Sequence, residues 1–257
     1  MLEITAKNNS KIKELKALIS SNRERKEKNL FVLEGVRLCY DGVRSGAFIK
    51  DVFCTNECMD KFPNQIDAIK SNAENFYIVT KDIIKSVSDT VNPQGVICTL
   101  KKENHTFTYE KGKKYIALDT VQNPDNLGAT ARTAEALGID GIIICGGCDI
   151  YNPKAQRAAM GSLLRMKIKI TDSLEDEIAE LEKIGIKSYA TVPDSSAKSI
   201  TDVDFSQGAM CIIGNEGNGI RPEILSLCDK ITIKMQGRAE SFNASVAASI
   251  VMWELMK

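Results

Sequence analysis

Histidine is nearly absent from this sequence: among 257 residues there is one, His105. Hydrolases with Ser-His or Cys-His chemistry take their general base from histidine, and most zinc enzymes take ligands from it. His105 lies in a polar stretch between Asn104 and Thr106, where a linker is expected. The scarcity of histidine therefore argues against hydrolases and zinc enzymes, and we expect no metal site.

Long apolar runs and an excess of charge of one sign are missing too. No run of about 18 or more apolar residues occurs, and the N-terminus lacks the basic, apolar and small-residue order of a secretion signal. We therefore expect a cytoplasmic protein that does not span a membrane. Lys and Arg number 34, and Asp and Glu also number 34, so any nucleic-acid site has to be a local patch.

The eight cysteines lie mostly within apolar segments, where a free thiol behaves as a small hydrophobic side chain. Cys145 and Cys148 have the CxxC spacing of redox and metal sites. No second pair of matching spacing accompanies them, and no helix is expected directly after Cys148. We interpret this pair as part of a loop.

Short apolar strands alternate with helical segments along most of the chain, which predicts an α/β protein. Residues 31–100 form a first series, and the polar stretch 101–114 separates it from a second. We place the domain boundary there, with domains of residues 1–105 and 106–257. In the second domain, a strand over 115–118, a helix and a strand over 141–145 form a βαβ unit, which predicts a parallel sheet.

The densest basic cluster lies on the first expected helix and the turn after it. Residues 1–29 contain eight lysines and arginines and four acidic residues. A solvated helix face is one interpretation, and a patch that contacts RNA phosphates is the other. If the second holds, Arg23, Arg25 and Lys26 are the candidate RNA-binding residues.

Two expected strand ends near the C-terminus are the best candidates for a ligand site. A strand over 210–213 ends in a loop with three glycines in six residues, 214–219, and a strand over 231–233 ends in a polar loop, 236–240. Ligands of open α/β sheets bind beyond the carboxyl ends of the strands. The glycine loop matches neither GxGxxG nor GxxxxGK[ST], so a nucleotide-phosphate site has little support.

Arg132 and Glu216 both follow strands of this second series. From the residues alone, each could equally be an ordinary surface side chain.

The final helix, expected over 241–256, is apolar around most of its circumference. A helix of this kind must be buried, so we expect it to form a homodimer interface.

Three motifs in these regions together resemble the SpoU family of RNA ribose 2′-O-methyltransferases, the TrmH-like branch of the SPOUT superfamily. They are NPDNLGATARTAEALG at 123–138, IIGNEGNGI at 212–220 and IKMQGRAESFNASVA at 233–247. FVLEGVRL at 31–38 is similar to the ribosomal-protein-like RNA-binding domain that often precedes this catalytic domain. Phe242 and Ala244 depart from the family's usual leucine and valine, so the cofactor pocket is expected to differ slightly in shape.

The resemblance implies S-adenosylmethionine as methyl donor and a trefoil knot in the C-terminal domain. It implies an RNA substrate, with ribosomal RNA expected and transfer RNA or a catalytically idle RNA-binding protein as alternatives. Around the cofactor it places Thr191, Gly214, Ile233, Met235 and Phe242. In the polar catalytic cluster it places Asn126, Arg132, Glu216, Ser241 and Asn243.

The resemblance names Arg132 as the residue that activates the ribose hydroxyl. A guanidinium with a pKa above about 12 is a poor base. We therefore interpret Arg132 as a fixed cation that lowers the pKa of the hydroxyl, and we expect Glu216 to pair with it and orient it. Ser241 and Asn243 would supply hydrogen bonds.

Overall fold

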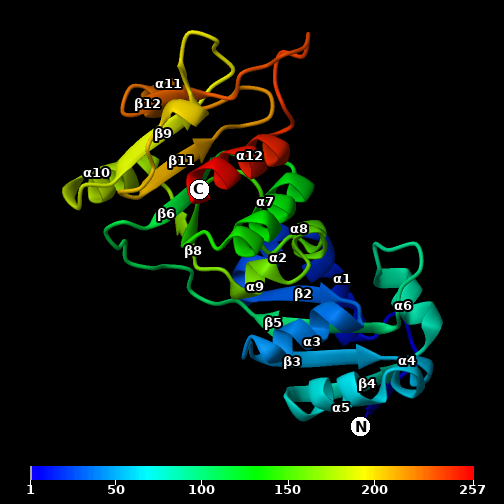
Figure 1. Cartoon of the computed structure of the whole chain (residues 1–257). Helices are drawn as coiled ribbons and strands as arrows, with labels where there is room; N and C mark the ends of the chain where they lie inside the picture. The colour runs from blue at the N-terminus through cyan, green and yellow to red at the C-terminus, as the bar shows by residue number, and fades with distance from the viewer. Residues whose placement is uncertain (1) are drawn as a thin grey trace. The chain divides into compact units, whose positions relative to one another are not determined.

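A computed structural model describes residues 2–257, which form two compact units (Figure 1). The first unit contains the chain up to Glu103 together with Asp149–Leu164, and the second contains Asn104–Cys148 and Arg165–Lys257. Each unit has its own sheet covered by helices, so the α/β class is confirmed. The short segment 149–164 thus belongs with the first unit although the chain around it belongs with the second.

The first unit has a five-stranded sheet in the order β1-β4-β3-β5-β2. These strands are β1 (Leu2–Ile4), β2 (Leu30–Glu34), β3 (Ile49–Cys54), β4 (Ala73–Val79) and β5 (Val96–Lys101). Strand β3 is parallel to β4 and antiparallel to β5, and β2 is antiparallel to β5. The carboxyl ends of β2, β3 and β4 therefore lie at the same edge of the sheet as the start of β5.

The helices of the first unit cover both faces of this sheet. They are α1 (Ser10–Ser20), α2 (Asn22–Lys28), α3 (Val36–Arg44), α4 (Asn56–Lys61), α5 (Pro63–Ser71), α6 (Lys81–Val87) and α8 (Pro153–Ala159). Ile12, Leu15 and Leu18 recur at helical spacing on α1 and are buried against the sheet, as their pattern predicts. The Asn9 side chain accepts from the backbone N–H of Lys11 and caps α1.

The second unit has a seven-stranded sheet in the order β10-β12-β9-β11-β6-β7-β8. The strands are β6 (Lys114–Asp119), β7 (Gly141–Cys145), β8 (Ile168–Thr171), β9 (Lys187–Thr191), β10 (Lys198–Ser199), β11 (Ala209–Ile213) and β12 (Asp229–Thr232). Every pairing among these strands is parallel. The parallel sheet predicted from the βαβ unit is therefore confirmed, while the knot stays a prediction.

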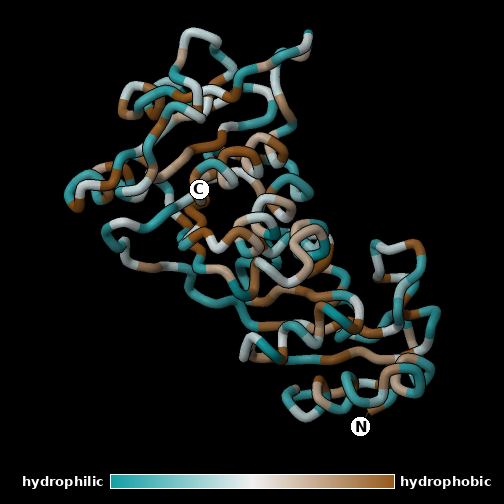
Figure 2. Tube along the Cα trace, in the orientation of Figure 1, coloured by the Kyte–Doolittle hydropathy of each residue, from teal (hydrophilic) through white to brown (hydrophobic). Residues whose placement is uncertain are grey.

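The helices of this unit are α7 (Pro124–Leu137), α10 (Leu174–Lys183), α11 (Pro222–Leu225) and α12 (Ala244–Met256), with a 3₁₀ turn at Ile200–Asp202; α9 (Ser162–Arg165) lies where the chain passes between units. Alternate residues of β6, Tyr115 and Ala117, face the cluster formed with α10. Helices α7 and α12 pack side by side and contact β6, β7 and β11 (Figure 1). Figure 2 shows the apolar colour concentrated along the strands that these helices cover.

The last helix begins three residues later than predicted, at Ala244. The reason is Asn243, whose side-chain oxygen accepts from the backbone N–H groups of Ser245 and Val246 and thus caps the helix. Among residues 2–257, none of the helices combines the length and the apolarity needed to cross a membrane.

Candidate active site

A cavity of about 480 Å³ lies in the second unit, where β9, β11 and β12 end next to one another. Its volume is in the range of small-molecule pockets. All the residues that the family resemblance assigns to the cofactor line this cavity: Thr191, Gly214, Ile233, Met235 and Phe242. Because neighbouring parallel strands end at one edge, segments far apart in the sequence meet there.

The glycine loop after β11 is closed on itself by main-chain hydrogen bonds. The N–H of Asn215 donates to the carbonyl of Gly219, and the N–H of Gly219 donates back, each over 3.0 Å. A Cβ on Gly214 would lie 2.3 Å from the carbonyl carbon of Gly219, so only glycine fits there. The loop therefore brings bare backbone to the cavity wall.

Asn215, which the sequence did not single out, organises this loop. Its Oδ1 accepts from the N–H groups of Gly217 (2.9 Å) and Asn218 (3.0 Å), and its Nδ2 donates to the carbonyl of Thr120 (2.9 Å). Asparagine side chains commonly stabilise turns in this way. An asparagine at the start of a glycine-rich loop was the available signal.

Glu216 holds the N-terminal end of α7. Its carboxylate accepts from the backbone N–H groups of Gln122 (3.1 Å) and Asn123 (3.0 Å). It also accepts from Nδ2 of Asn126 over 2.9 Å. Burial acts to raise the pKa of Glu216, but the hydrogen bond from Asn126 and those from the backbone outweigh it, so the pKa lies below its usual value.

Asn243 extends this network to α12. Its Nδ2 donates to Oδ1 of Asn126 over 3.0 Å, while its Oδ1 caps α12. The N-terminal ends of α7 and α12 are thus joined to the glycine loop through Asn126 and Glu216. Asn243, Glu216 and the exposed Ser241 all line the cavity. Asn126 does not line it, but is hydrogen-bonded to Glu216 and Asn243, which do.

Arg132 lies apart from this network. It is exposed on α7, does not line the cavity and makes no ion pair within residues 2–257. The expectation that Glu216 pairs with Arg132 is wrong. The Glu216 carboxylate instead accepts hydrogen bonds from the backbone N–H groups of Gln122 and Asn123, which have no partner within the helix. Arg132 follows the cap residue Asn123 by nine positions, roughly 13 Å along the helix axis.

Thr191 gives a test of whether the cavity suits S-adenosylmethionine. Its Oγ1 is buried and has no hydrogen-bond partner within residues 2–257. A buried hydroxyl without a partner is costly, so a polar ligand atom at this place would stabilise it. Apolar side chains of Ile233, Met235 and Phe242 complete the wall. Apolar surface with a few polar groups fits a purine nucleoside that carries a charged amino-acid chain.

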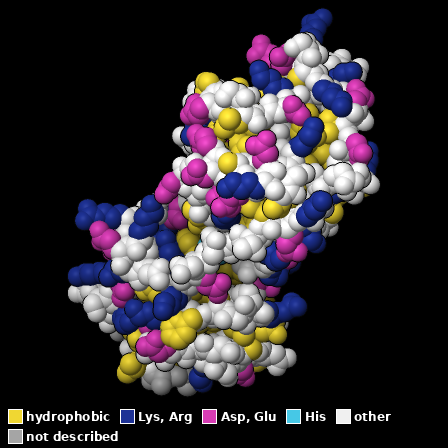
Figure 3. All heavy atoms as spheres, turned by 90° about the vertical axis from the view of Figure 1, so that its left-hand side faces the viewer, with side chains coloured by type: hydrophobic (Ala, Val, Ile, Leu, Met, Phe, Trp, Pro, Cys, Tyr) yellow, Lys and Arg dark blue, Asp and Glu magenta, His cyan; other side chains and the backbone are white. Residues whose placement is uncertain are grey.

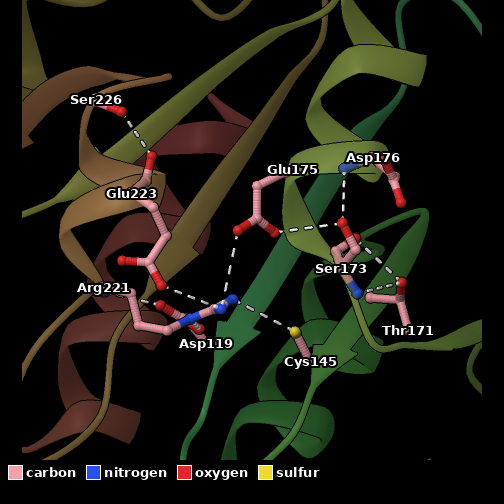
Figure 4. A network of polar contacts seen from close by, with 9 residues as sticks. All are labelled: Asp119, Cys145, Thr171, Ser173, Glu175, Asp176, Arg221, Glu223 and Ser226. Atoms are coloured by element: carbon pink, nitrogen blue, oxygen red, sulfur yellow. Dashed lines mark hydrogen bonds and ion pairs between the residues drawn. The ribbon is translucent and has the colours of Figure 1, made fainter.

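An ion pair between Asp119 and Arg221 anchors the far end of the glycine loop (Figure 4). Asp119 is fully buried at the end of β6 and accepts from the backbone N–H (2.9 Å) and from Nε (2.8 Å) of Arg221. Glu223 and Glu175 lie 3.5 Å and 3.9 Å from the same guanidinium. Burial acts to lower the pKa of Arg221, but Asp119 outweighs it and the pKa is raised. An aspartate directly after an apolar strand was the missed signal.

The candidate RNA-binding residues lie in the first unit and differ in exposure. Arg25 is only 3% exposed: its Nε binds Asp149 over 2.8 Å and its Nη1 donates to the carbonyl of Leu18 over 2.7 Å. The prediction that Arg25 contacts RNA is therefore wrong, because its guanidinium is already bound inside the protein. Arg23, paired with Glu27, and Lys26 are exposed and stay predictions.

On one face of the molecule, side chains of both signs of charge lie in close mixture (Figure 3). On the face drawn in Figure 3, basic and acidic side chains alternate rather than gather into one large field. Within residues 2–257, no three side chains of the types that bind metals come together as a metal site. Because the chain has no net charge, any recognition of RNA must use a local arrangement of charges.

Comparison with protein families identifies two parts of the chain. The SpoU rRNA Methylase family model matches residues 113–253, and the MRM3-like substrate binding domain matches residues 9–98. The 23S rRNA (guanosine(2553)-2′-O)-methyltransferase RlmP of Bacillus subtilis is 29% identical over 259 residues, which cover 99% of each chain. The 23S rRNA (guanosine-2′-O-)-methyltransferase RlmB of Acinetobacter baylyi is 34% identical over 142 residues, 54% of this chain and 57% of that one.

Solved structures of methyltransferases are similar to this chain over nearly its whole length. The rRNA methyltransferase from Sinorhizobium meliloti with bound AdoMet superposes with a TM-score of 0.88 at 27% identity and covers 98% of this chain and 96% of that one. AviRb from Streptomyces viridochromogenes, at 23% identity and a TM-score of 0.86, shares the fold over 97% of both chains. Because the family model spans more than half of the sequence, the chain belongs to the SpoU rRNA methylase family.

Proposed function

We propose that the chain transfers a methyl group from S-adenosylmethionine to a ribose 2′-hydroxyl of RNA, with ribosomal RNA as the substrate, in the cytoplasm. The observation that carries the proposal is the cavity at the ends of β9, β11 and β12, where the five expected cofactor residues meet. The named activities of the B. subtilis and A. baylyi relatives support ribosomal RNA. Methyl transfer from labelled S-adenosylmethionine to ribosomal RNA, with alkali resistance at the modified nucleotide, tests it.

When bound, S-adenosylmethionine supplies a methyl group on a positively charged sulfur. The protein must hold this group, bring a ribose hydroxyl close and favour loss of the hydroxyl proton. The network of Glu216, Asn126 and Asn243 holds the loop and both helix ends that frame the cavity. In this proposal Arg132, which lies outside this network and is held by no ion pair within residues 2–257, supplies the positive charge that lowers the pKa of the hydroxyl.

We expect one S-adenosylmethionine to bind per chain without RNA, because the cavity wall is formed by the chain itself. Thr191→Val removes the hydroxyl that has no partner and should weaken binding roughly three- to tenfold, the size of one hydrogen bond. Titration calorimetry measures both the number of cofactor molecules bound per chain and the affinity. Thr108→Val, at an exposed threonine of the same unit, is the control and should bind as wild type. Absence of both heat and thermal stabilisation at about 1 mM cofactor would refute the cofactor assignment.

We further propose that the first unit holds the RNA while the second does the chemistry. The match of residues 9–98 to a substrate binding domain supports this division, and every candidate catalytic residue lies in the second unit. A cut at residue 105 is a poor test, because α8 packs on β2 within the first unit and would lose that partner. Point substitutions in the complete chain are the better route.

We also propose a homodimer through α12. One side of the helix is buried by Ala248, Val251 and Leu255, yet Trp253 stays 58% exposed. Trp253→Asp should convert a dimer to a monomer in light scattering, because a buried unpaired charge is costly in an interface. Leu227→Asp, at a residue 51% exposed in the same unit, should leave the dimer intact. A monomeric wild type, or a Trp253→Asp protein that stays dimeric, would contradict the proposal.

A further inference from the structure

A second cavity, of about 370 Å³, lies in the first unit at the sheet edge where β3 and β4 end and β5 begins. Its walls come from α4, α6 and the loop before β5. Its lining includes Cys58, three lysines (Lys61, Lys81 and Lys85) and the loop 91–94. We call it the lysine cavity.

The lysine cavity carries a local positive charge in a protein without net charge. Lys81 is neutralised by Glu57, whose carboxylate lies 2.5 Å from the ammonium. Lys61 and Lys85 are exposed and have no acidic partner within residues 2–257. Two lysines without an acidic partner therefore line one small cavity, an arrangement that favours a phosphate.

The positive charge of Lys61 acts on the thiol of Cys58, another residue that lines the cavity. A hydrogen bond from Cys54 lowers the pKa of Cys58 most, burial opposes it, and the positive charge of Lys61 lowers it further. Lys61 and Cys58 both line the cavity. The Lys61 ammonium lies over the ring of Phe62, 5.4 Å from its centroid, at the rim of the cavity, where a phosphate can reach it.

The loop before β5 adds apolar surface and amide groups. Val91 is 94% exposed at the rim of the cavity. The Oε1 of Gln94 accepts from the N–H of Val36 over 2.9 Å, which leaves its amide hydrogens free to donate. The amide of Asn92 has no hydrogen bond within residues 2–257. Unpaired RNA bases are bound by contacts to the base face, hydrogen bonds to the base edge and cations on the phosphate. Here the apolar side chain of Val91 and the ring of Pro93 offer the contact to the base face, since no aromatic side chain among residues 2–257 lines the cavity.

The loop is fixed against the start of α4, so the cavity is preformed. The N–H of Thr55 donates to the carbonyl of Gly95 over 2.9 Å. Gly95 has φ +92°, and a Cβ there would lie 2.5 Å from Oγ1 of Thr55. This position requires glycine, both for its backbone angle and for the close approach to α4.

We infer that the lysine cavity binds one unpaired nucleotide of the RNA substrate, with Lys61 and Lys85 on the phosphate and the loop 91–94 on the base. The inference rests on the proposed function and names where the first unit contacts the RNA. It shifts the main contact from the basic helices near the N-terminus to the carboxyl ends of β3 and β4. Carboxyl ends of strands are the usual ligand edge of open α/β sheets.

The test is charge reversal in the complete chain, Lys61→Glu with Lys85→Glu. The probe is a fluorescein-labelled single-stranded RNA of mixed sequence and about 20 nucleotides, titrated by anisotropy at several salt concentrations. We expect affinity to fall at least tenfold, and the neutral pair Lys61→Met with Lys85→Met to reduce the slope of log K against log salt by about 1.4 for two lost phosphate contacts. The control, Lys70→Glu with Lys101→Glu, alters two exposed lysines elsewhere in the unit and should stay within about twofold of wild type.

A second variant probes the base. Val91→Ala should weaken RNA binding about threefold and leave the salt slope unchanged, because it removes apolar contact and no charge.

RNA affinity within about twofold of wild type in the Lys61 and Lys85 variants, or an equal loss in the control, would overturn the inference. Calorimetry with S-adenosylmethionine is run on every protein. If wild type binds the cofactor and RNA but the charge-reversed protein still binds RNA, only this inference fails; if wild type binds no cofactor, the proposed function fails.

Discussion

Arg132→Ala is expected to abolish methyl transfer while folding and cofactor binding stay as in wild type. The guanidinium is exposed, lines no part of the cofactor cavity and makes no ion pair within residues 2–257. Its loss should therefore cost little stability, and alanine is at least as good a helix former. A cation that acts mainly on charge developing in the transition state should lower turnover by about 100- to 1,000-fold, or roughly 3 to 4 kcal/mol.

The measurement is single-turnover methyl transfer from labelled S-adenosylmethionine to ribosomal RNA, with calorimetry of the cofactor and a thermal melt alongside. Arg165→Ala is the matched control, because Arg165 binds Glu135 of α7 from outside the site. We expect that variant to lose some stability and keep its activity. Arg132→Ala with more than about a tenth of the wild-type rate would show that the guanidinium is not needed for the chemistry.

Gly214→Ala is expected to damage the cofactor site directly. The added Cβ would lie 2.3 Å from the carbonyl carbon of Gly219 and 2.4 Å from the nitrogen of Ile220. These are backbone atoms, held by the hydrogen bonds of Asn215 and by the pair of Arg221 with Asp119. Because no flexible side chain can move aside, the loop itself must shift. Strain of about 1 to 3 kcal/mol should weaken cofactor binding by roughly fivefold to 150-fold.

Calorimetry with S-adenosylmethionine and a thermal melt measure this effect. Gly237→Ala is the control in the neighbouring loop, since a Cβ on Gly237 would meet nothing within 4 Å. We expect Gly237→Ala to bind and melt as wild type. If Gly214→Ala binds the cofactor within about threefold of wild type, the close approach at Gly214 does not shape the site.

The local pattern of the sequence was enough to predict the class of the fold, and the family motifs pointed to residues that line one cavity of the second unit. Apolar residues at helical spacing identified the buried face of α1, and the βαβ unit around α7 predicted the parallel sheet. Strands followed by glycines and polar residues indicated the ligand edge, and the motifs added the residues that line the cavity. The fold class was predictable because helix and strand periodicities depend on residues close together in the chain. The residues expected at the cofactor came from the family motifs and stay a prediction.

Which residues the charged side chains contact was decided only by the tertiary structure. Glu216 follows β11 and binds the start of α7, some ninety positions earlier in the chain, because β11 lies beside β6 in the sheet. Arg25 looked like part of a basic patch, but its guanidinium is buried against Asp149. Nothing in the local pattern predicts the contact of Glu216 with α7 or the ion pair of Arg25 with Asp149. The first depends on the order of the strands, and the second depends on the segment 149–164 belonging to the first unit. A charge in the sequence has no assigned partner until the backbone has brought distant segments together, and a buried charge then requires one.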